Sequence, residues 1–171
     1  SAEGPDSTLT ATLSDSLVGN LKATDRSLIK ASIGGTLTGD VSAIDSDIIL
    51  TAGSVIGNLY AEDDSPASIT ADVGNVTGSV TAVNTGAKIT LTADTVTGSL
   101  ATLHGGTLTA SIANTFMGTT SDDSIEDLAT NDLVLNLAGG ATWNLTDSST
   151  VSTLNAEGGL LALWTAGWVR R

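Results

Sequence analysis

The sequence predicts an all-β fold: a right-handed, single-stranded parallel β-helix of about eight coils. Three observations predict it, namely a recurrent unit close to twenty residues long, strict alternation of apolar and polar residues inside that unit, and a shortage of aromatic residues. We expect residues 1–140 to form the coils. Residues 141–171 are expected to form a tryptophan-rich cap that continues the helix.

A narrow core follows from the composition. Hydrophobic residues make up 40% of the chain, but aromatic residues only 3%. Large aromatic side chains normally contribute much of a compact interior, so a folded chain with so few of them needs a thin core of Val, Ile, Leu and Ala. A solenoid provides such a core.

The charge excludes one class of partner and favours an exported chain. The net charge is -13 with only 6 Lys and Arg residues, whereas binding of nucleic acid needs clustered basic residues. The chain has no cysteine, and therefore no disulfide and no thiolate metal site. No apolar run is long enough to span a bilayer, and the start Ser1-Ala2-Glu3-Gly4-Pro5 does not resemble a signal peptide. We therefore expect an excised fragment whose targeting sequence and membrane anchor lie outside it.

A unit of the form apolar-x-Gly-polar-apolar recurs along the chain. Its glycines are Gly19, Gly39, Gly57, Gly78, Gly98 and Gly118, and the differences between successive numbers are 20, 18, 21, 20 and 20. Each glycine is in phase with apolar residues two before and two after it. We therefore expect these glycines to face the interior, where the absent side chain leaves room for large residues opposite.

Each unit is expected to contain two strands. Around the first glycine, Leu17, Leu21 and Ala23 alternate with polar residues, which places them on the inner face of a strand. The outward positions next to the glycines hold Asn20, Asp40, Asn58, Ser79 and Ser99. A second alternating triplet follows each glycine: Ile29/Ala31/Ile33, Ile48/Leu50/Ala52, Ile69/Ala71/Val73, Ile89/Leu91/Ala93, Leu108/Ala110/Ile112 and Leu133/Leu135/Leu137. Turn formers such as Asp25, Asn84 and His104 separate the strands, and like positions should stack into ladders about 4.8 Å apart.

The pattern changes after Gly118. Trp143 takes the place of the glycine in the next unit, 25 residues later, so that coil carries an insertion. The acidic stretch from Ser121 to Asp127 is expected to form a loop that bulges from the stack. Trp143, Trp164 and Trp168 are expected to close the C-terminal end of the core against solvent.

The C-terminal part of the chain resembles a known family. The run from Ala141 to Gly159, ATWNLTDSSTVSTLNAEGG, is similar to the junction near the end of pertactin-like and diffuse-adherence-type autotransporter passengers. That junction has a tryptophan strand, a Ser-Thr-Val turn and a Gly-Gly step in this order. The resemblance implies a right-handed β-helix that ends in an autochaperone segment. It also implies export across the periplasm and outer membrane of a Gram-negative bacterium, and an outer-membrane β-barrel in the same precursor.

These features predict a surface adhesin that mediates cell aggregation, biofilm formation or adhesion to host cells. A parallel solenoid offers a long surface on which many weak contacts add up. The expected partners are a second copy on another cell, a host surface or matrix protein or a glycan, and the β-barrel of the same precursor. The alternative is that the fragment is a stalk or folding module of a secreted polysaccharide-active or other virulence enzyme.

We expect no enzyme, cofactor or metal site in this fragment. His104 lies in a Leu-His-Gly-Gly turn, and the chain has no Gly-x-Ser-x-Gly motif for a nucleophilic serine. Carboxylates that could act as paired acids or bind calcium occur in three groups: Asp45/Asp47, Glu62/Asp63/Asp64 and Asp122/Asp123/Glu126/Asp127. Because all three groups lie between strands, solvated turns are the favoured interpretation. Neither the calcium-binding nonapeptide nor the spacing of an EF-hand loop is present.

Outward threonine pairs raise one further possibility. Thr90/Thr92 and Thr107/Thr109 have the pattern of flat ice-binding faces on other solenoids. The rows are expected to be interrupted by Lys22, Asp40, Lys88 and Tyr60, which favours an ordinary solvated β-face.

Overall fold

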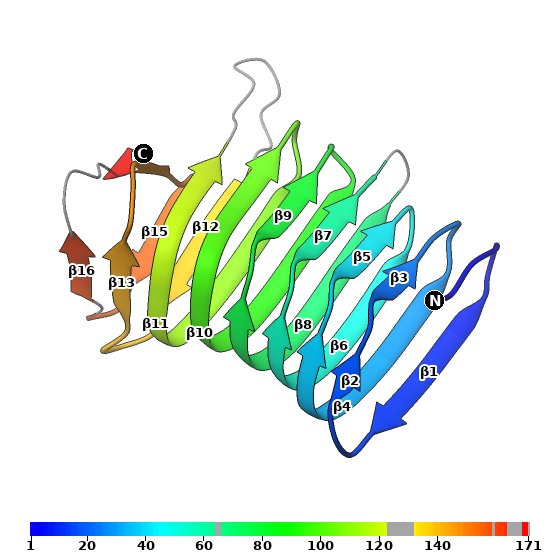
Figure 1. The fold of residues 1–171 in the computed structure, drawn as a ribbon. Helices are drawn as coiled ribbons and strands as arrows, with labels where there is room; N and C mark the ends of the chain where they lie inside the picture. The colour runs from blue at the N-terminus through cyan, green and yellow to red at the C-terminus, as the bar shows by residue number, and fades with distance from the viewer. Residues whose placement is uncertain (64–65, 123–131, 159, 164–168, 171) are drawn as a thin grey trace.

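The chain forms a parallel β-solenoid of about seven turns, shown in Figure 1 as a computed structural model. The structure describes residues 1–63, 66–122, 132–158, 160–163 and 169–170. Within these ranges there is no helix, and hence no apolar helix long enough to cross a membrane. The predicted all-β, parallel, coiled fold is confirmed, and the expectation of about eight coils is close to the turns that are formed.

The described residues form seventeen strands, fifteen in one continuous sheet and two, β14 and β17, in a separate sheet. They are β1 (Thr8–Leu13), β2 (Leu17–Val18), β3 (Leu21–Ala23), β4 (Leu28–Thr38), β5 (Val41–Ile44), β6 (Asp47–Ile56), β7 (Leu59–Glu62), β8 (Ala67–Thr77), β9 (Val80–Val83), β10 (Ala87–Leu103), β11 (Thr107–Asp122), β12 (Asp132–Leu137), β13 (Thr142–Leu145), β14 (Ser149–Thr150), β15 (Thr153–Ala156), β16 (Leu160–Leu163) and β17 (Val169–Arg170).

One coil shows how the outer surface divides into three faces. Residues 28–33 of β4 run along the first face, and the chain bends at Gly34 and Gly35 before residues 36–38 form the second face. A corner at Gly39 and Asp40 then leads into β5, which forms the third face. Every coil pairs in parallel with its neighbours, so that equivalent positions form rows along the solenoid axis.

The second apolar triplet of every unit stacks as predicted. The register of the first face places its inward residues in three rows, which the structure buries almost completely. The rows are Ile29, Ile48, Ile69, Ile89, Leu108, Leu133; then Ala31, Leu50, Ala71, Leu91, Ala110, Leu135; and then Ile33, Ala52, Val73, Ala93, Ile112, Leu137. Alternation therefore predicted both the face and the register of this part of the core.

The predicted role of the repeat glycines is wrong. Gly19, Gly39, Gly57 and Gly78 each lie between two strands, whereas β10 and β11 run through Gly98 and Gly118. The glycine φ angles lie between 140° and 156°, a conformation that side chains rarely adopt. A Cβ atom on Gly39, Gly57, Gly78 or Gly98 would lie within 3.0 Å of the carbonyl oxygen of the glycine one coil earlier. The glycines thus permit close backbone stacking at a corner, and only buried Gly118 also lies against a core side chain, the ring of Phe116.

Polar side chains next to these glycines connect successive coils. The Asp40 amide donates to Asn20 Oδ1 at 2.8 Å, the Asn58 amide donates to Asp40 Oδ1 at 2.8 Å, and the Ser79 amide donates to Asn58 Oδ1 at 2.9 Å. Ser99 Oγ donates to Ser79 Oγ at 2.9 Å. This ladder gives the exposed corner amides partners that the sheet does not provide.

The turns between the third and first faces use the expected turn formers. Asp25, Asp45, Asn84 and His104 all have positive φ, a region that Asp, Asn and His occupy more readily than most residues. Buried Ser27 connects two coils there, because its amide donates to Ser46 Oγ at 3.1 Å.

Trp143 occupies a different position from the predicted one. It pairs with Phe116, and Leu145 pairs with Gly118. The rings of Trp143 and Phe116 stack with centroids 5.4 Å apart, and the indole N–H donates to the Gly118 carbonyl at 3.1 Å. Trp143 continues the row of inward residues that precede each corner glycine by two positions, such as Phe116 before Gly118. Its large apolar ring is buried in the core there. Trp164 and Trp168 lie outside the described residues.

Candidate ligand groove

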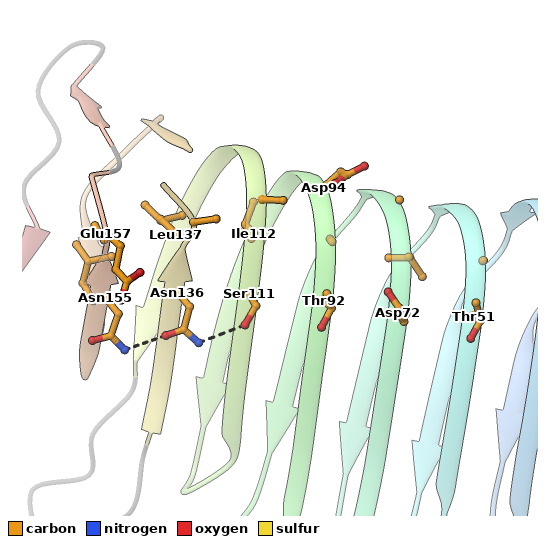
Figure 2. Close-up of a pocket in the computed structure, with 18 residues that line it drawn as sticks. Thr51, Asp72, Thr92, Asp94, Ser111, Ile112, Asn136, Leu137, Asn155 and Glu157 are labelled. Atoms are coloured by element: carbon orange, nitrogen blue, oxygen red, sulfur yellow. Dashed lines mark hydrogen bonds between the residues drawn. The ribbon is translucent and has the colours of Figure 1, made fainter. Parts of the chain in front are cut away.

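A groove of about 930 Å³ runs across the coils at the bend between the first and second faces (Figure 2). It crosses β6, β8, β10, β11, β12 and β15, so its long direction follows the solenoid axis. The bend lies where the strand register shifts, between Ala93 and Thr95 against the next coil. The groove is thus a product of stacking, because each coil contributes the same few positions to its wall.

One wall of the groove is a row of polar side chains. Figure 2 shows them side by side on successive coils: Thr51, Asp72, Thr92, Ser111, Asn136 and Asn155. Asn155 Nδ2 donates to Asn136 Oδ1 at 2.8 Å, and Asn136 Nδ2 donates to Ser111 Oγ at 3.2 Å. The C-terminal half of the row is therefore held in a defined orientation by its own hydrogen bonds.

The groove stays open because, apart from Asp94 on β10, the residues at the bend are small. Gly74, Ala113 and Ala138 line it where larger side chains would fill the space. Behind them lie the edges of inward residues such as Ile112 and Leu137, which are almost fully buried. A ligand would therefore contact a polar wall and a shallow apolar floor formed mainly by the exposed methyl groups of Ala113, Ala138 and Ala156.

The groove is acidic. Asp72, Asp94 and Glu157 are exposed and line it, whereas none of the lining residues is Lys, Arg or His. The whole chain adds a net charge of -13 to this local field. Anionic ligands are therefore disfavoured here, and groups that donate hydrogen bonds to carboxylates are favoured.

The carboxylates that the sequence singled out lie elsewhere. Asp45 is in a turn between the third and first faces, and Asp47 accepts a hydrogen bond from Ser68 Oγ at 2.5 Å. Asp63 is buried in the same series of turns, and Asp122 accepts a hydrogen bond from Thr102 Oγ1 at 2.8 Å. None of them lines the groove. Asp64, Asp123, Glu126 and Asp127 lie outside the described residues.

The structure agrees with the turn assigned to His104, which is exposed and has a φ of 52°. In the part of the chain that the structure describes, no group of three or more His, Asp and Glu residues is arranged to hold a metal ion.

The threonine pairs lie on the first face. Of the four residues expected to interrupt the threonine rows, only Lys88 lies on that face. Thr90 pairs with Thr109, and Lys88 pairs with Thr107. Lys22 and Tyr60 belong to the third face and Asp40 to the glycine corner, because the coil turns at each glycine. The predicted placement of these three residues in the threonine rows is therefore wrong.

A smaller hollow of about 410 Å³ lies on the third face beside the glycine corner. Tyr60 lines it, and its hydroxyl donates to Glu62 Oε2 at 2.9 Å. Burial raises the pKa of Tyr60 above its usual value of 10.0, and the hydrogen bond and negative charge of Glu62 raise the pKa further.

Sequence reasoning missed the groove although one signal pointed to part of it. The alternation Ile69-Thr70-Ala71-Asp72-Val73 already places Asp72 outward, in the row that became the polar wall. The bend that brings Asp94 and Glu157 to the same groove has no alternating pattern. Only the folded coil shows that these acids line one groove.

Comparison of the chain with protein-family models, with curated proteins and with solved structures finds no match.

Proposed function

We propose that this chain is part of an autotransporter passenger, an adhesin displayed on the surface of a Gram-negative bacterium. The observation that carries the proposal is the stacking of outward polar side chains in rows along the solenoid axis, of which the row from Ser32 through Thr92 to Asn136 is polar on every coil. Such rows offer a long surface on which many weak hydrogen bonds add up without a deep pocket. The resemblance of residues 141–159 to passenger junctions supports the same proposal.

The proposed partners are a second copy of the passenger on a neighbouring cell, or a protein or glycan on a host surface or matrix. In the full precursor, an outer-membrane β-barrel would export the passenger and anchor it. The fragment itself carries no enzymatic activity in this proposal and acts only by binding.

Beads coated with the purified chain provide a direct test. We expect them to aggregate with one another or to adhere to epithelial cells more than beads coated with a heat-unfolded sample of the same chain. Flow cytometry and microscopy would measure both effects. If folded and unfolded coatings give the same aggregation and the same adhesion, the fragment is not an adhesin.

A second function in folding is favoured by the stacked rings of Phe116 and Trp143 at the C-terminal end of the core. Residues 141–171 would then act as a template on which the earlier coils fold. Deletion of these residues should prevent refolding from denaturant, whereas deletion of residues 1–19 should not. Equal refolding of both truncated chains, followed by circular dichroism, would exclude this role.

A further inference from the structure

We propose, building on the adhesin function above, that the groove binds an extended, uncharged glycan whose sugars follow the solenoid axis, one sugar to a coil. The sugars would lie along the row from Thr51 to Asn155.

The spacing of the coils favours this ligand. Neighbouring strands of a parallel sheet are separated by about 4.8 Å, which is close to the length of one pyranose ring in an extended glycan. Successive sugars would therefore meet equivalent side chains on successive coils. An extended peptide does not match this spacing, because its residues rise by only about 3.3 Å each.

The chemistry of the wall matches that of sugar hydroxyls. A sugar hydroxyl both donates and accepts hydrogen bonds, and so do the hydroxyls of Thr51, Thr92 and Ser111. The Asn136 and Asn155 amides offer both kinds of group, and the carboxylates of the groove accept from hydroxyls. The apolar floor would contact the C–H groups of the rings.

Other ligands fit the groove less well. Asp72, Asp94 and Glu157 repel acidic polymers, and no basic side chain among the lining residues offsets them. Along most of the groove a peptide could not add to the sheet as a further strand, because the wall strands from β6 to β12 already pair with neighbouring coils on both sides.

The purified full chain tests the proposal with four neutral, linear hexasaccharides, made of glucose, mannose, galactose or N-acetylglucosamine. We expect at least one of them to bind saturably in calorimetry, with an affinity that is insensitive to salt because the ligand has no charge. The acidic comparison is a hexauronate, and the cationic comparison is the deacetylated glucosamine hexamer. The hexauronate should bind more weakly than the best neutral ligand. The cationic hexamer is attracted by the acidic groove, so the part of its binding that depends on charge should be lost as salt is added, unlike that of the neutral ligand.

A pair of matched variants on one coil locates the site. Thr92→Val removes an exposed hydroxyl from the groove wall with little change in shape, and Thr97→Val does the same on the second face, outside the groove. Thr92→Val should weaken binding about three- to tenfold, and Thr97→Val should leave it unchanged. Asp72→Asn with Asp94→Asn should improve binding of the hexauronate.

The proposal is overturned if no neutral hexasaccharide binds, if the hexauronate binds best, or if both Thr→Val variants weaken binding equally. These failures are separable from those of the adhesin function. Coated beads that adhere while no glycan binds would leave the adhesin function standing and reject the glycan. If the chain binds a glycan but its coated beads neither adhere nor aggregate, the glycan site stands and the adhesin function is rejected.

Discussion

At the scale of single residues, the corner glycines show how closely the coils approach one another. The backbone of each glycine lies against the carbonyl oxygen of the preceding one, at a position where any Cβ atom would collide. Gly19 differs from the others, because it belongs to the first such corner and no atom lies within 4 Å of its Cβ position. Its φ of 140° is nevertheless almost the same as the 144° of Gly98.

This difference allows strain and stacking to be separated. Gly19→Ala should lower the free energy of unfolding by about 1 to 3 kcal/mol, because alanine is strained at this φ. Gly98→Ala should lower the free energy of unfolding by about 1 to 3 kcal/mol more than Gly19→Ala does, because its methyl group also forces neighbouring coils apart. Urea denaturation followed by circular dichroism would measure both values. Equal losses would mean that backbone conformation alone explains the glycine repeat.

The raised pKa of Tyr60 gives a spectroscopic prediction. It is the one tyrosine of the chain, so the rise of tyrosinate absorbance at alkaline pH reports this residue alone. The folded chain should ionise above pH 10, and Glu62→Gln should lower the pKa without returning it fully to normal, because burial remains. The control is the unfolded chain in urea, which should titrate near the usual value.

The same shift affects stability. The folded state binds the tyrosine proton more tightly than the unfolded state does, so its contribution is fully present below the unfolded pKa. The contribution is then lost as the pH rises through the folded pKa. An ionisation of Tyr60 in the folded chain at or below the value found in urea would contradict this assignment.

At the scale of elements, the last turns differ from the earlier ones in how they fill the core. Earlier coils place Leu37, Val55, Val76 and Val96 in the inward row before the corner glycines. Further along, the row holds the stacked aromatic rings on β11 and β13, and Leu161 of β16 follows Trp143 in the register. We infer that these rings stabilise the C-terminal coils, because they fill more of the core than the aliphatic residues of the earlier coils.

Two substitutions of Trp143 measure this contribution. Trp143→Ala should cost about 3 to 5 kcal/mol, because it leaves a cavity beneath the final coils. Trp143→Phe retains a ring against Phe116 and loses the hydrogen bond to Gly118, which should cost about 1 to 3 kcal/mol. Thermal and urea unfolding of the two variants would give the values. A loss for Trp143→Ala no greater than that for Trp143→Phe would show that ring packing contributes little.

At the scale of the whole molecule, the chain combines long polar rows with a net charge of -13. If two copies associate through these rows, their negative charges repel one another. The repulsion extends over about 30 Å at 0.01 M salt but only about 8 Å at 0.15 M. Self-association should therefore strengthen as salt is added.

Sedimentation velocity across this range of ionic strength would measure the effect. The control is a variant in which surface acids away from the groove are changed to amides, such as Asp15→Asn with Asp40→Asn. It should associate at a lower salt concentration than the unchanged chain does. An association constant that is independent of salt would exclude self-association of acidic faces as the adhesive contact.

The sequence by itself determined the repeat, the inward residues and their stacking into rows. These features are local, because alternation of apolar and polar residues sets the face of each strand and equal spacing sets the register between coils. The residues from Ile29 to Ile33 and their equivalents are therefore where the pattern placed them. The turn positions of Asp25, Asp45, Asn84 and His104 followed from their tolerance of positive φ.

Only the tertiary structure decided where each coil turns, and this determined the outer faces. The chain turns at Gly39 and at the equivalent glycines instead of continuing as one straight strand. Tyr60 and Thr70 therefore lie on different faces, although the alternating patterns around them look alike. Trp143 likewise follows the inward row of Phe116, since a large ring gains more from burial than from keeping the spacing of the glycines. Asp72, Asp94 and Glu157 line one groove from different coils because the backbone bends at the same place in each coil, and no local pattern encodes that bend.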